Sequence, residues 1–577
     1  MKRLFLVMLG LTTFAFFGCH NIRFMKEQVD KVQVNAPVDV LEVHADSVNI
    51  DFETVIPKRY FNKNTLMKVE PLIIVGNDTT LLEPQMIAGE KIDKTNKVIA
   101  QVIPFKTGGR VPYHARIPYK KGMNTAKLNV AYSFKKDNKY EEFQVCAPNV
   151  KSKKFGEGIV ATSQTVKNTD NLQTAGNFDP IPIQKKGTIY YEINRWKVKD
   201  SSSKKPEIVV LKDLVTDPKY VITNIAFKSA ASPDGKLSWN TKLAQERNNS
   251  STNFILDEFR KVGFQGVYDS SFIKNDATPE DWEGFKNIIQ GSDVGRRDDI
   301  LAIINSNLPP DIKEKNIKKL GNWKVLTKSY LPNLRKSDVT LFAETRMRKY
   351  EELKTLYDNN QLDEFNKPEL LLFAYNNTNL DEKLVVYKYY QDKYPSEWIG
   401  NNNIAFVYLM KGETDKAIDI LKKINEQYPD NKEILNNIGV CYRIKKDYGK
   451  ALEYFKMANA KGVDERNNSG ITKIQQGKYD EAAKTFEPDR CDYNKALAYT
   501  LAKDYENALK TIDCIEDKTG DDFYLRAIIA ARQNDLDLLT TSLNRAVKKD
   551  PNIRTRAKED YEFLRYWNNI EFENALR

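Results

Sequence analysis

A period of 34 residues in the last third of the chain constrains its fold more than any other feature. Small, aromatic and aliphatic residues recur at this spacing after about residue 369. The clearest pairs are Ala405 and Gly439, Tyr408 and Tyr442, Ala417 and Ala451, and Leu421 and Phe455, whereas Lys446 and Val463 replace Gly412 and Pro429. A fixed period of this length indicates stacked supersecondary units, because one unit alone cannot bury its apolar face.

The pattern resembles that of tetratricopeptide (TPR) repeats, in which small residues let two antiparallel helices approach closely. The resemblance predicts an α-solenoid over residues 369–552, with a C-terminal cap over residues 553–577. It implies a concave groove that binds a peptide of a partner protein, and asparagine can hydrogen-bond such a backbone whatever its sequence. The alternative is that the groove candidates are solvated helix residues. These candidates are Asn402, Asn403, Asn436, Asn437 and Arg443.

Two cysteines lie within one of the shorter repeat units. Cys491 falls near the start of its first predicted helix, and Cys514 falls near the end of its second. Because an antiparallel helix pair brings these two ends together, we predict a disulfide between them. The alternative is two buried free thiols.

The first 19 residues resemble the signal peptide of a bacterial lipoprotein. Lys2 and Arg3 precede an apolar run over residues 4–17, which Gly18 and Cys19 follow. A run of about 14 residues is shorter than the roughly 20 that a helix needs to span a bilayer. The resemblance implies cleavage after residue 18 and acylation of Cys19, with residues 19–36 as a tether. A plain secretory signal over residues 1–18 is the alternative.

Export limits the compartment and the partners. The residues after Cys19 lack the acidic cluster that surface-exported Bacteroidetes lipoproteins carry. We therefore expect an outer membrane lipoprotein that faces the periplasm, with the cell surface as the alternative. The net charge of +11 favours association with anionic lipid or cell-wall polymer. No basic run interleaved with aromatic residues stands out, so we expect no nucleic-acid partner.

Short runs of alternating apolar and polar residues fill the region 37–150. Examples are residues 66–75, 98–103 and 128–134, and Gly, Pro, Asn and Asp separate such runs. A β-sandwich is the natural way to bury these strands, so we predict one over residues 37–150. Residues 151–186 are richer in Lys, Ser, Thr, Asn and Gly, and we interpret them as a linker with some strand content.

Strand and helix patterns alternate from residue 187 to residue 345. We expect strands at 188–193 and 221–227, helices at 205–215 and 240–262, and a last strand near 339–342 after a helical insertion at 279–334. The turn at 229–235, followed by Asn240, Leu243 and Arg247, resembles the hallmark of the C-terminal domain of the OmpA family. This resemblance implies an α/β domain over residues 187–345.

In members of that family that bind the cell wall, an Asp of the turn and the Arg of the helix hold the diaminopimelate of peptidoglycan. Arg247 matches the Arg, but Ser232 stands at the position of the Asp, and Asp234 is the nearest carboxylate. The alternative is that Arg247 is a helix-surface residue with an intrahelical partner. The implied peptidoglycan site consists of Ser232, Asp234, Asn240 and Arg247.

Residues for catalysis or metal binding are scarce. The only histidines are His20, His44 and His114, and no two cysteines lie at a metal-ligand spacing. No nucleophile, base and orienting residue form a recognisable pattern. We therefore expect no metal, no cofactor and no enzymatic activity.

The sequence thus predicts a multidomain α+β protein. It has an N-terminal β-sandwich, a central α/β OmpA-like domain, a connecting helix at 346–368 and a C-terminal α-solenoid of TPR repeats. The predicted function is that of a non-catalytic, lipid-anchored envelope protein whose repeats bind other envelope proteins at the outer membrane. The alternatives are a peptidoglycan-binding anchor and an unrecognised envelope enzyme.

Overall fold

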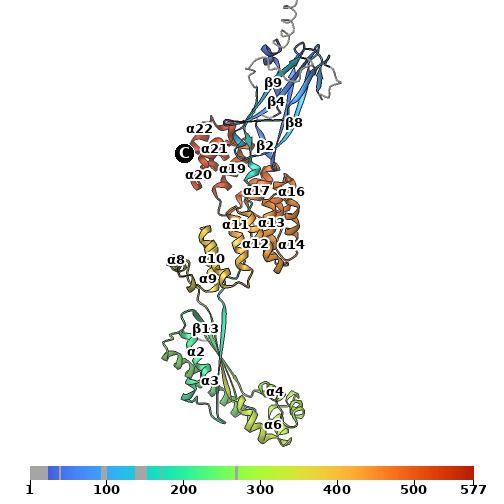
Figure 1. Ribbon diagram of the computed structural model, residues 1–577. Helices are drawn as coiled ribbons and strands as arrows, with labels where there is room; N and C mark the ends of the chain where they lie inside the picture. Colours follow the sequence, from blue (N-terminus) through green and yellow to red (C-terminus); the bar gives the residue numbers. More distant parts are fainter. Residues whose placement is uncertain (1–23, 38–39, 93–99, 137–152, 170–171, 267–270) are drawn as a thin grey trace, which may run out of the picture. The chain divides into compact units, whose positions relative to one another are not determined.

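The computed structural model describes residues 24–37, 40–92, 100–136, 153–169, 172–266 and 271–577 (Figure 1). The chain divides into two compact units. The larger unit combines Met1–Thr174 with Tyr408–Arg577, and the smaller unit is Ala175–Val407. The lipidation candidate Cys19 lies outside the described residues. None of the helices within them is both long and apolar enough to cross a membrane.

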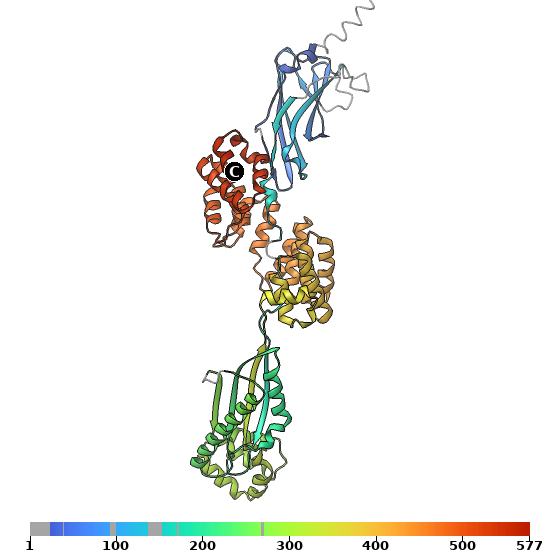
Figure 2. The ribbon, with the colours of Figure 1, turned by 90° about the vertical axis from the view of Figure 1, so that its left-hand side faces the viewer.

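Two β-sheets that share one hydrophobic core form the N-terminal part of the larger unit (Figure 2). Alternation of apolar and polar residues builds this core, as Val48, Ile50 and Phe52 are buried on one side of their strand. The first sheet contains β1 (Gln33–Asn35), β2 (Leu41–His44), β3 (Ser47–Ile56), β8 (Gly109–Pro118) and β11 (Ile159–Val160). The second sheet contains β4 (Thr65–Val75), β5 (Asp78–Leu81), β6 (Gln85–Gly89), β7 (Gln101–Ile103), β9 (Lys127–Lys136) and β10 (Lys153–Glu157).

Residues 151–186, interpreted as a linker with some strand content, do contain strands, but these strands belong to sheets and not to a linker. Strand β10 pairs with β9, and β11 pairs in parallel with β2, so residues 153–160 complete the two sheets. The 3-10 helix η3 (Thr162–Thr165) follows, and β12 already begins at Pro182. The polar composition of the segment hid the place of these strands in the sheets, because edge strands bury fewer apolar residues than central strands do.

Antiparallel helix pairs make up the C-terminal part of the larger unit, which confirms the predicted helical repeat region. The helices are α12 (Thr414–Gln427), α13 (Lys432–Ile444), α14 (Tyr448–Asn459), α15 (Arg466–Gln475), α16 (Tyr479–Thr485), α17 (Tyr493–Leu501), α18 (Tyr505–Asp513), α19 (Gly520–Gln533) and α20 (Leu536–Lys549). Helices α21 (Ile553–Glu559), η8 (Tyr561–Tyr566) and α22 (Ile570–Ala575) close the chain and share a core with α19 and α20.

Small residues allow the two helices of each pair to approach. A Cβ atom on Gly439 of α13 would lie 2.5 Å from the Phe455 ring of α14, and one on Gly470 of α15 would lie 2.7 Å from the Phe486 ring. Real Cβ atoms do not approach that closely, so glycine is required opposite each phenylalanine. The helix pairs therefore depend on matched residue sizes, as the 34-residue pattern indicated.

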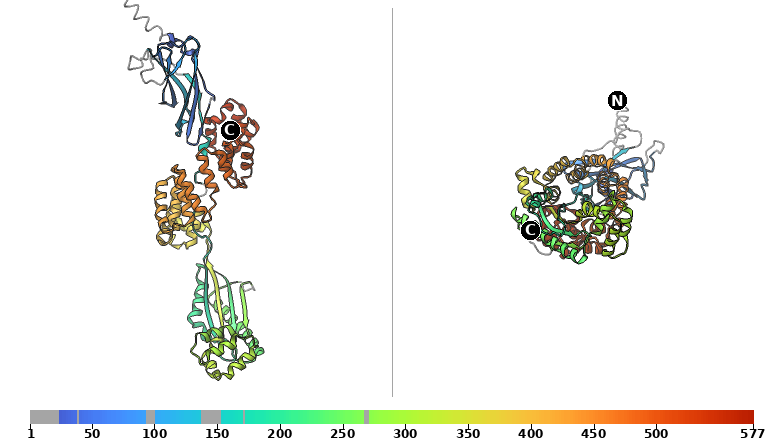
Figure 3. Two further views of the ribbon diagram at one scale, coloured as in Figure 1. Left: turned by 90° about the vertical axis from the view of Figure 1, so that its right-hand side faces the viewer. Right: turned by 90° about the horizontal axis from the view of Figure 1, so that it is seen from below.

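The smaller unit contains a four-stranded sheet with the order β12-β15-β13-β14 (Figure 3). Its strands are β12 (Pro182–Tyr190), β13 (Tyr220–Ala230), β14 (Ile273–Thr278) and β15 (Lys336–Thr345). Helices α2 (Pro206–Thr216) and α3 (Leu237–Lys261) share a core with this sheet. The sequence reading missed β14, which has few apolar residues. The mixed strand order is compatible with the OmpA resemblance, which stays a prediction.

A helical insertion separates β14 from β15 and has a core of its own. It consists of α4 (Trp282–Gln290), α5 (Arg297–Asn305), α6 (Pro310–Lys319), α7 (Trp323–Val325), η5 (Leu326–Tyr330) and η6 (Leu331–Leu334). After the sheet come α8 (Tyr350–Asp358), η7 (Leu362–Glu364), α9 (Lys367–Asn376), α10 (Leu380–Lys393) and α11 (Ile399–Met410). The segment 346–368 is thus a short helix and a 3-10 turn, and not one continuous connecting helix.

Candidate functional site

A segment of the chain itself lies against the first helices of the repeats. We call residues 162–169 and 172–174 the strap. Within the larger unit it contacts α13, α15 and α17, the first helices of three successive pairs. The candidate binding groove of the repeats is therefore occupied by a segment of the same chain.

Two asparagines bind the strap through its main chain. The Asn494 carboxamide on α17 accepts a hydrogen bond from the Lys167 N–H at 2.9 Å and donates one to the Lys167 carbonyl at 3.2 Å. The Asn437 carboxamide on α13 does the same with Gln173, at 2.9 and 2.7 Å. An amide side chain that engages both polar groups of one residue recognises an extended backbone and not a side chain. We call this arrangement a clamp.

Arg443 binds the strap between the two clamps. Its guanidinium donates to the Asn168 carbonyl and, at 2.8 Å, to Oδ1 of Asn468 on α15. It also lies over the Phe455 ring, 5.7 Å from the centroid. Arg443 is fully buried, and these acceptors and the ring replace part of its hydration. Gln475 on α15 donates to the side chain of the same Asn168.

Apolar and aromatic contacts hold the strap at both ends. The Tyr493 hydroxyl donates to Thr165 at 2.6 Å, and the Lys167 ammonium lies 4.6 Å from the centre of the Tyr493 ring. Burial raises the pKa of Tyr493, so it remains a neutral hydrogen-bonding group. Val166 joins the core of the later repeats, and Leu172 packs against the core around Phe455.

The smaller unit contains a third clamp. The Asn403 carboxamide on α11 accepts from the Ala175 N–H and donates to the Ala175 carbonyl, both at 2.8 Å. Asn402 donates to Asn403 at 3.2 Å, which orients the clamp. The same chemistry thus recurs on a further first helix.

The five predicted groove residues divide into two kinds. Asn403, Asn437 and Arg443 bind main-chain atoms, whereas Asn402 and Asn436 donate to the neighbouring asparagine. The sequence reading missed Asn494 as well as the pair Asn467 and Asn468. A simple signal marks all of them, since each pair ends two residues before the small residue of the first helix. The four instances are Asn402-Asn403 before Ala405, Asn436-Asn437 before Gly439, Asn467-Asn468 before Gly470, and Tyr493-Asn494 before Ala496.

The asparagine pair of α15, Asn467 and Asn468, forms no clamp with the strap, unlike Asn403, Asn437 and Asn494 on the other first helices. Asn468 accepts from Arg443 and donates to the Asn436 side chain at 2.7 Å, so it takes part in an asparagine ladder. Asn467 is 4% exposed, and within the part of the chain that the structure describes neither its amide nitrogen nor its oxygen has a hydrogen-bond partner. A buried carboxamide without partners is costly and calls for an explanation.

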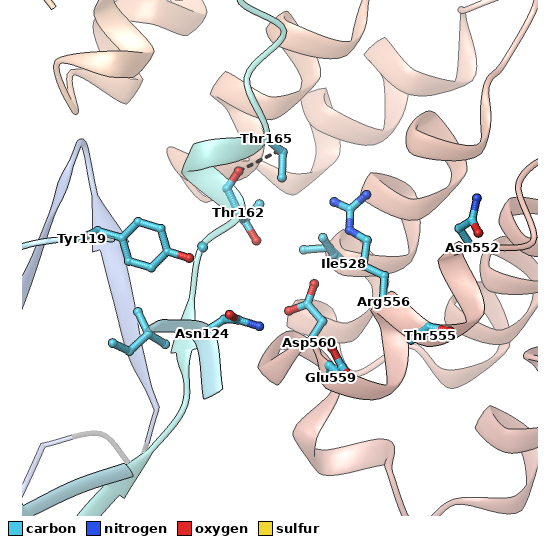
Figure 4. Close-up of a pocket in the computed structure, with 12 residues that line it drawn as sticks. Tyr119, Asn124, Thr162, Thr165, Ile528, Asn552, Thr555, Arg556, Glu559 and Asp560 are labelled. Carbon is cyan, nitrogen blue, oxygen red and sulfur yellow. Dashed lines mark hydrogen bonds between the residues drawn. The ribbon is translucent and has the colours of Figure 1, made fainter. Parts of the chain in front are cut away.

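A cavity of about 400 Å³ lies beside the strap in the larger unit (Figure 4). Tyr119 and Asn124 of the sandwich line it, as do Thr165 and, from the C-terminal helices, Arg556 and Asp560. The Arg556 guanidinium pairs with Asp521 at 2.8 Å and lies 4.1 Å from the centre of the Tyr524 ring, whose hydroxyl donates to Asp560 at 2.7 Å. Arg556 and Asp560 thus already have partners outside the lining, and the lining contains neither a cysteine nor a histidine.

The predicted peptidoglycan residues lie close together in the smaller unit, but their charges already have partners. Arg247 is 1% exposed, and its three nitrogens donate to the carbonyls of Arg195, Ala230 and Glu192. Burial lowers the pKa of Arg247 to about 10, still well above neutrality. Asp234 forms a 2.8 Å ion pair with Arg335, which also donates to Ser232.

Asn240, the fourth of these residues, donates to the Ser232 carbonyl at 3.3 Å and to the Glu280 carboxylate at 2.9 Å. The interpretation of Arg247 as a helix-surface residue is wrong, because this side chain is buried.

The cysteines and histidines of the described residues show no arrangement for reactive chemistry. Cys491 and Cys514 form a disulfide whose Cα atoms lie 5.6 Å apart. Burial raises the pKa of the Cys441 thiol to about 12, so this thiol stays protonated. His44 packs edge-on against Tyr479, and the exposed His114 bonds Asp51. The described residues contain no cluster of side chains that could hold a metal ion.

No protein-family model matches this chain, and no curated protein is similar to it in sequence. Solved structures of tetratricopeptide repeat proteins align with parts of it. One from Parabacteroides merdae aligns at 20% identity over 37% of this chain and 98% of its own, with a TM-score of 0.30. PilF of Pseudomonas aeruginosa aligns at 17% identity over 34% and 88%, with a TM-score of 0.26. These low scores support no functional argument, so the repeat assignment rests on the chain's own helix pairs and period.

Proposed function

We propose that this protein is a non-catalytic scaffold that acylated Cys19 tethers to the outer membrane, facing the periplasm, and that its repeats bind other envelope proteins. The observation that carries the proposal is the set of asparagine clamps on the first helices α11, α13 and α17. A clamp satisfies one N–H and one carbonyl of an extended segment, which is the chemistry of peptide recognition and not of bond cleavage.

Peptidoglycan anchoring through the OmpA-like module is the less supported alternative. A stem peptide would have to compete with Arg335 for Asp234 and with three carbonyls for Arg247. An ion pair and hydrogen bonds inside one folded domain need no association entropy, so a free ligand competes poorly with them. A hidden enzyme has no supporting observation.

Two measurements test the scaffold proposal. Metabolic labelling with a radioactive fatty acid should mark the wild-type protein and Cys146→Ser but not Cys19→Ser, which should appear in the soluble periplasmic fraction. Crosslinking in intact envelopes, followed by mass spectrometry, should then identify other envelope proteins bound to the wild type. An unlabelled wild-type protein, or one that crosslinks to no other protein, contradicts the proposal.

A further inference from the structure

We propose that the groove along α13, α15 and α17 binds an extended segment of a partner protein, and that the strap is a built-in competitor which this segment displaces. The inference rests on the proposed function and deepens it, because it assigns the binding site and the form of the ligand. The ligand class is a peptide in extended conformation whose main chain carries most of the recognition.

The main-chain hydrogen bonds between the groove and the strap do not depend on the strap's side chains. Both clamps bind main-chain groups of the strap, and Arg443 binds a carbonyl. Any extended segment without proline at the clamped positions offers the same groups. A foreign segment can therefore replace the strap without loss of these bonds.

The strap leaves the hydrogen-bonding groups of one groove residue, Asn467, without partners in the described part of the chain. Asn467 occupies the place in its repeat that Tyr493 occupies on α17, and Tyr493 binds the strap residue Thr165. The Asn467 carboxamide nevertheless remains buried without a partner within the described part of the chain. A segment that offers a donor and an acceptor to Asn467 forms hydrogen bonds that the strap lacks.

The strap is held firmly at its N-terminal end, and the residues after Val166 are less buried. Thr162 and Ser163 are buried, and the Ser163 hydroxyl donates to the Val43 carbonyl of the sandwich at 2.9 Å. Beyond the buried Val166, each described residue of 167–169 and 172–174 is only half-buried. Few apolar contacts and half-exposed hydrogen bonds are typical of segments that open without global unfolding.

Peptide binding to the purified full-length protein tests this proposal. The probe is a fluorescent synthetic peptide of residues 161–178. It should bind weakly to the wild type, whose own strap competes at high effective concentration. It should bind at least about tenfold more tightly to a variant in which residues 166–174 are replaced by a Gly-Ser chain of equal length with proline at positions 167 and 173, because proline has no N–H to donate to the clamps. In that background, Asn437→Ala and Asn494→Ala should each weaken binding about tenfold. The control Asn459→Ala, on the exposed face of α14, should leave affinity unchanged.

Hydrogen exchange on the wild type provides a second measurement that needs no strap replacement. The amides of Lys167 and Gln173 should exchange faster than the buried amides of α13, and Asn437→Ala should accelerate exchange at Gln173 but not within α13. Exchange of the strap amides only through global unfolding overturns the proposal, and so does a strap-replaced, folded protein that binds no peptide. Neither result alters the acylation and crosslinking outcomes, so failure of this inference is distinguishable from failure of the scaffold function.

Discussion

Several buried polar side chains of this protein each form hydrogen bonds to two or more main-chain groups. Arg247, Asn437 and Asn494 each bind at least two backbone groups that other elements of the fold supply. Such residues are interior hydrogen-bonding centres, although in the sequence they look like ordinary polar helix residues. Their removal affects every element that they join.

Replacement of Arg247 by alanine should destabilise the smaller unit by about 2–4 kcal/mol, since it leaves three carbonyls without a donor. Urea denaturation of the purified protein measures this loss. The exposed Arg260 on the same helix provides the control, and Arg260→Ala should cost less than about 0.5 kcal/mol. If Arg247→Ala abolished binding to purified sacculi while stability stayed unchanged, Arg247 would be a ligand-binding residue instead.

At the scale of the helix pair, residue sizes complement each other at a constant offset. The small residue of the first helix is followed 16 residues later by a larger one of the second helix. Where the small residue is glycine, the larger one is phenylalanine, as in Gly439 with Phe455 and Gly470 with Phe486. Where the small residue is alanine, the larger one is a smaller aliphatic residue, as in Ala496 with Ile512 and Ala527 with Leu543. The sum of the two volumes is thus roughly conserved, as close packing requires.

Gly439→Ala should therefore destabilise the repeats by about 1–3 kcal/mol, because its Cβ would overlap the Phe455 ring. The double variant Gly439→Ala, Phe455→Leu recreates the pairing found elsewhere in the chain and should regain part of that loss. Thermal unfolding of the two single variants and the double variant forms a double-mutant cycle. Additive losses, with no recovery in the double variant, would show that this contact does not set the packing.

The disulfide of the pair α17 and α18 is the second device at this scale. It joins residues 23 positions apart, so Cys491→Ser should lower stability by about 2–4 kcal/mol under oxidising conditions and by much less in the presence of a reductant. Mass spectrometry of the unreduced protein should find these two cysteines linked. Full alkylation of both in the native protein would instead show free thiols.

The Cys441 thiol should alkylate only after denaturation, because it is buried and protonated.

At the scale of the larger unit, a buried ion pair joins segments that are distant in sequence. Arg532 of α19 pairs with Glu562 at 2.5 Å and with Glu42 of the sandwich at 2.7 Å. Thr162 donates to Glu562 at 2.6 Å, so the start of the strap belongs to the same network. The sandwich, the strap and the last repeats therefore depend on one cluster of charges.

Arg532→Ala should cost about 3 kcal/mol at neutral pH, since it leaves the buried Glu562 carboxylate without its cation. Burial already raises the pKa of Glu562 above its ordinary value, and loss of Arg532 raises it further. A carboxyl group with a raised folded-state pKa stabilises the fold when protonated, and this contribution is lost as pH rises through that pKa. The stability deficit relative to the wild type should thus shrink from pH 7 to pH 5. Glu42→Gln, at the more exposed partner, provides the control and should have little effect.

Local patterns determined the elements that the sequence could predict. The 34-residue period, the strand alternation and the size pairing act between neighbours in the chain, so they identified the β-rich region and the helical repeats. The clamp asparagines could also be predicted from the sequence, because each stands two residues before the small residue of its first helix. Strand β14 escaped prediction, because its pairing and not its composition makes it a strand.

Only the tertiary structure decided what those residues bind. Asn437 and Gln173 are 264 residues apart, and Arg532 and Glu42 are 490 apart. No local periodicity links such positions, because their contact follows from how the sandwich and the repeats pack within the larger unit. The sequence therefore determined that the chain has helical repeats with asparagines on their first helices, whereas the folded structure decided that the chain's own strap binds those asparagines.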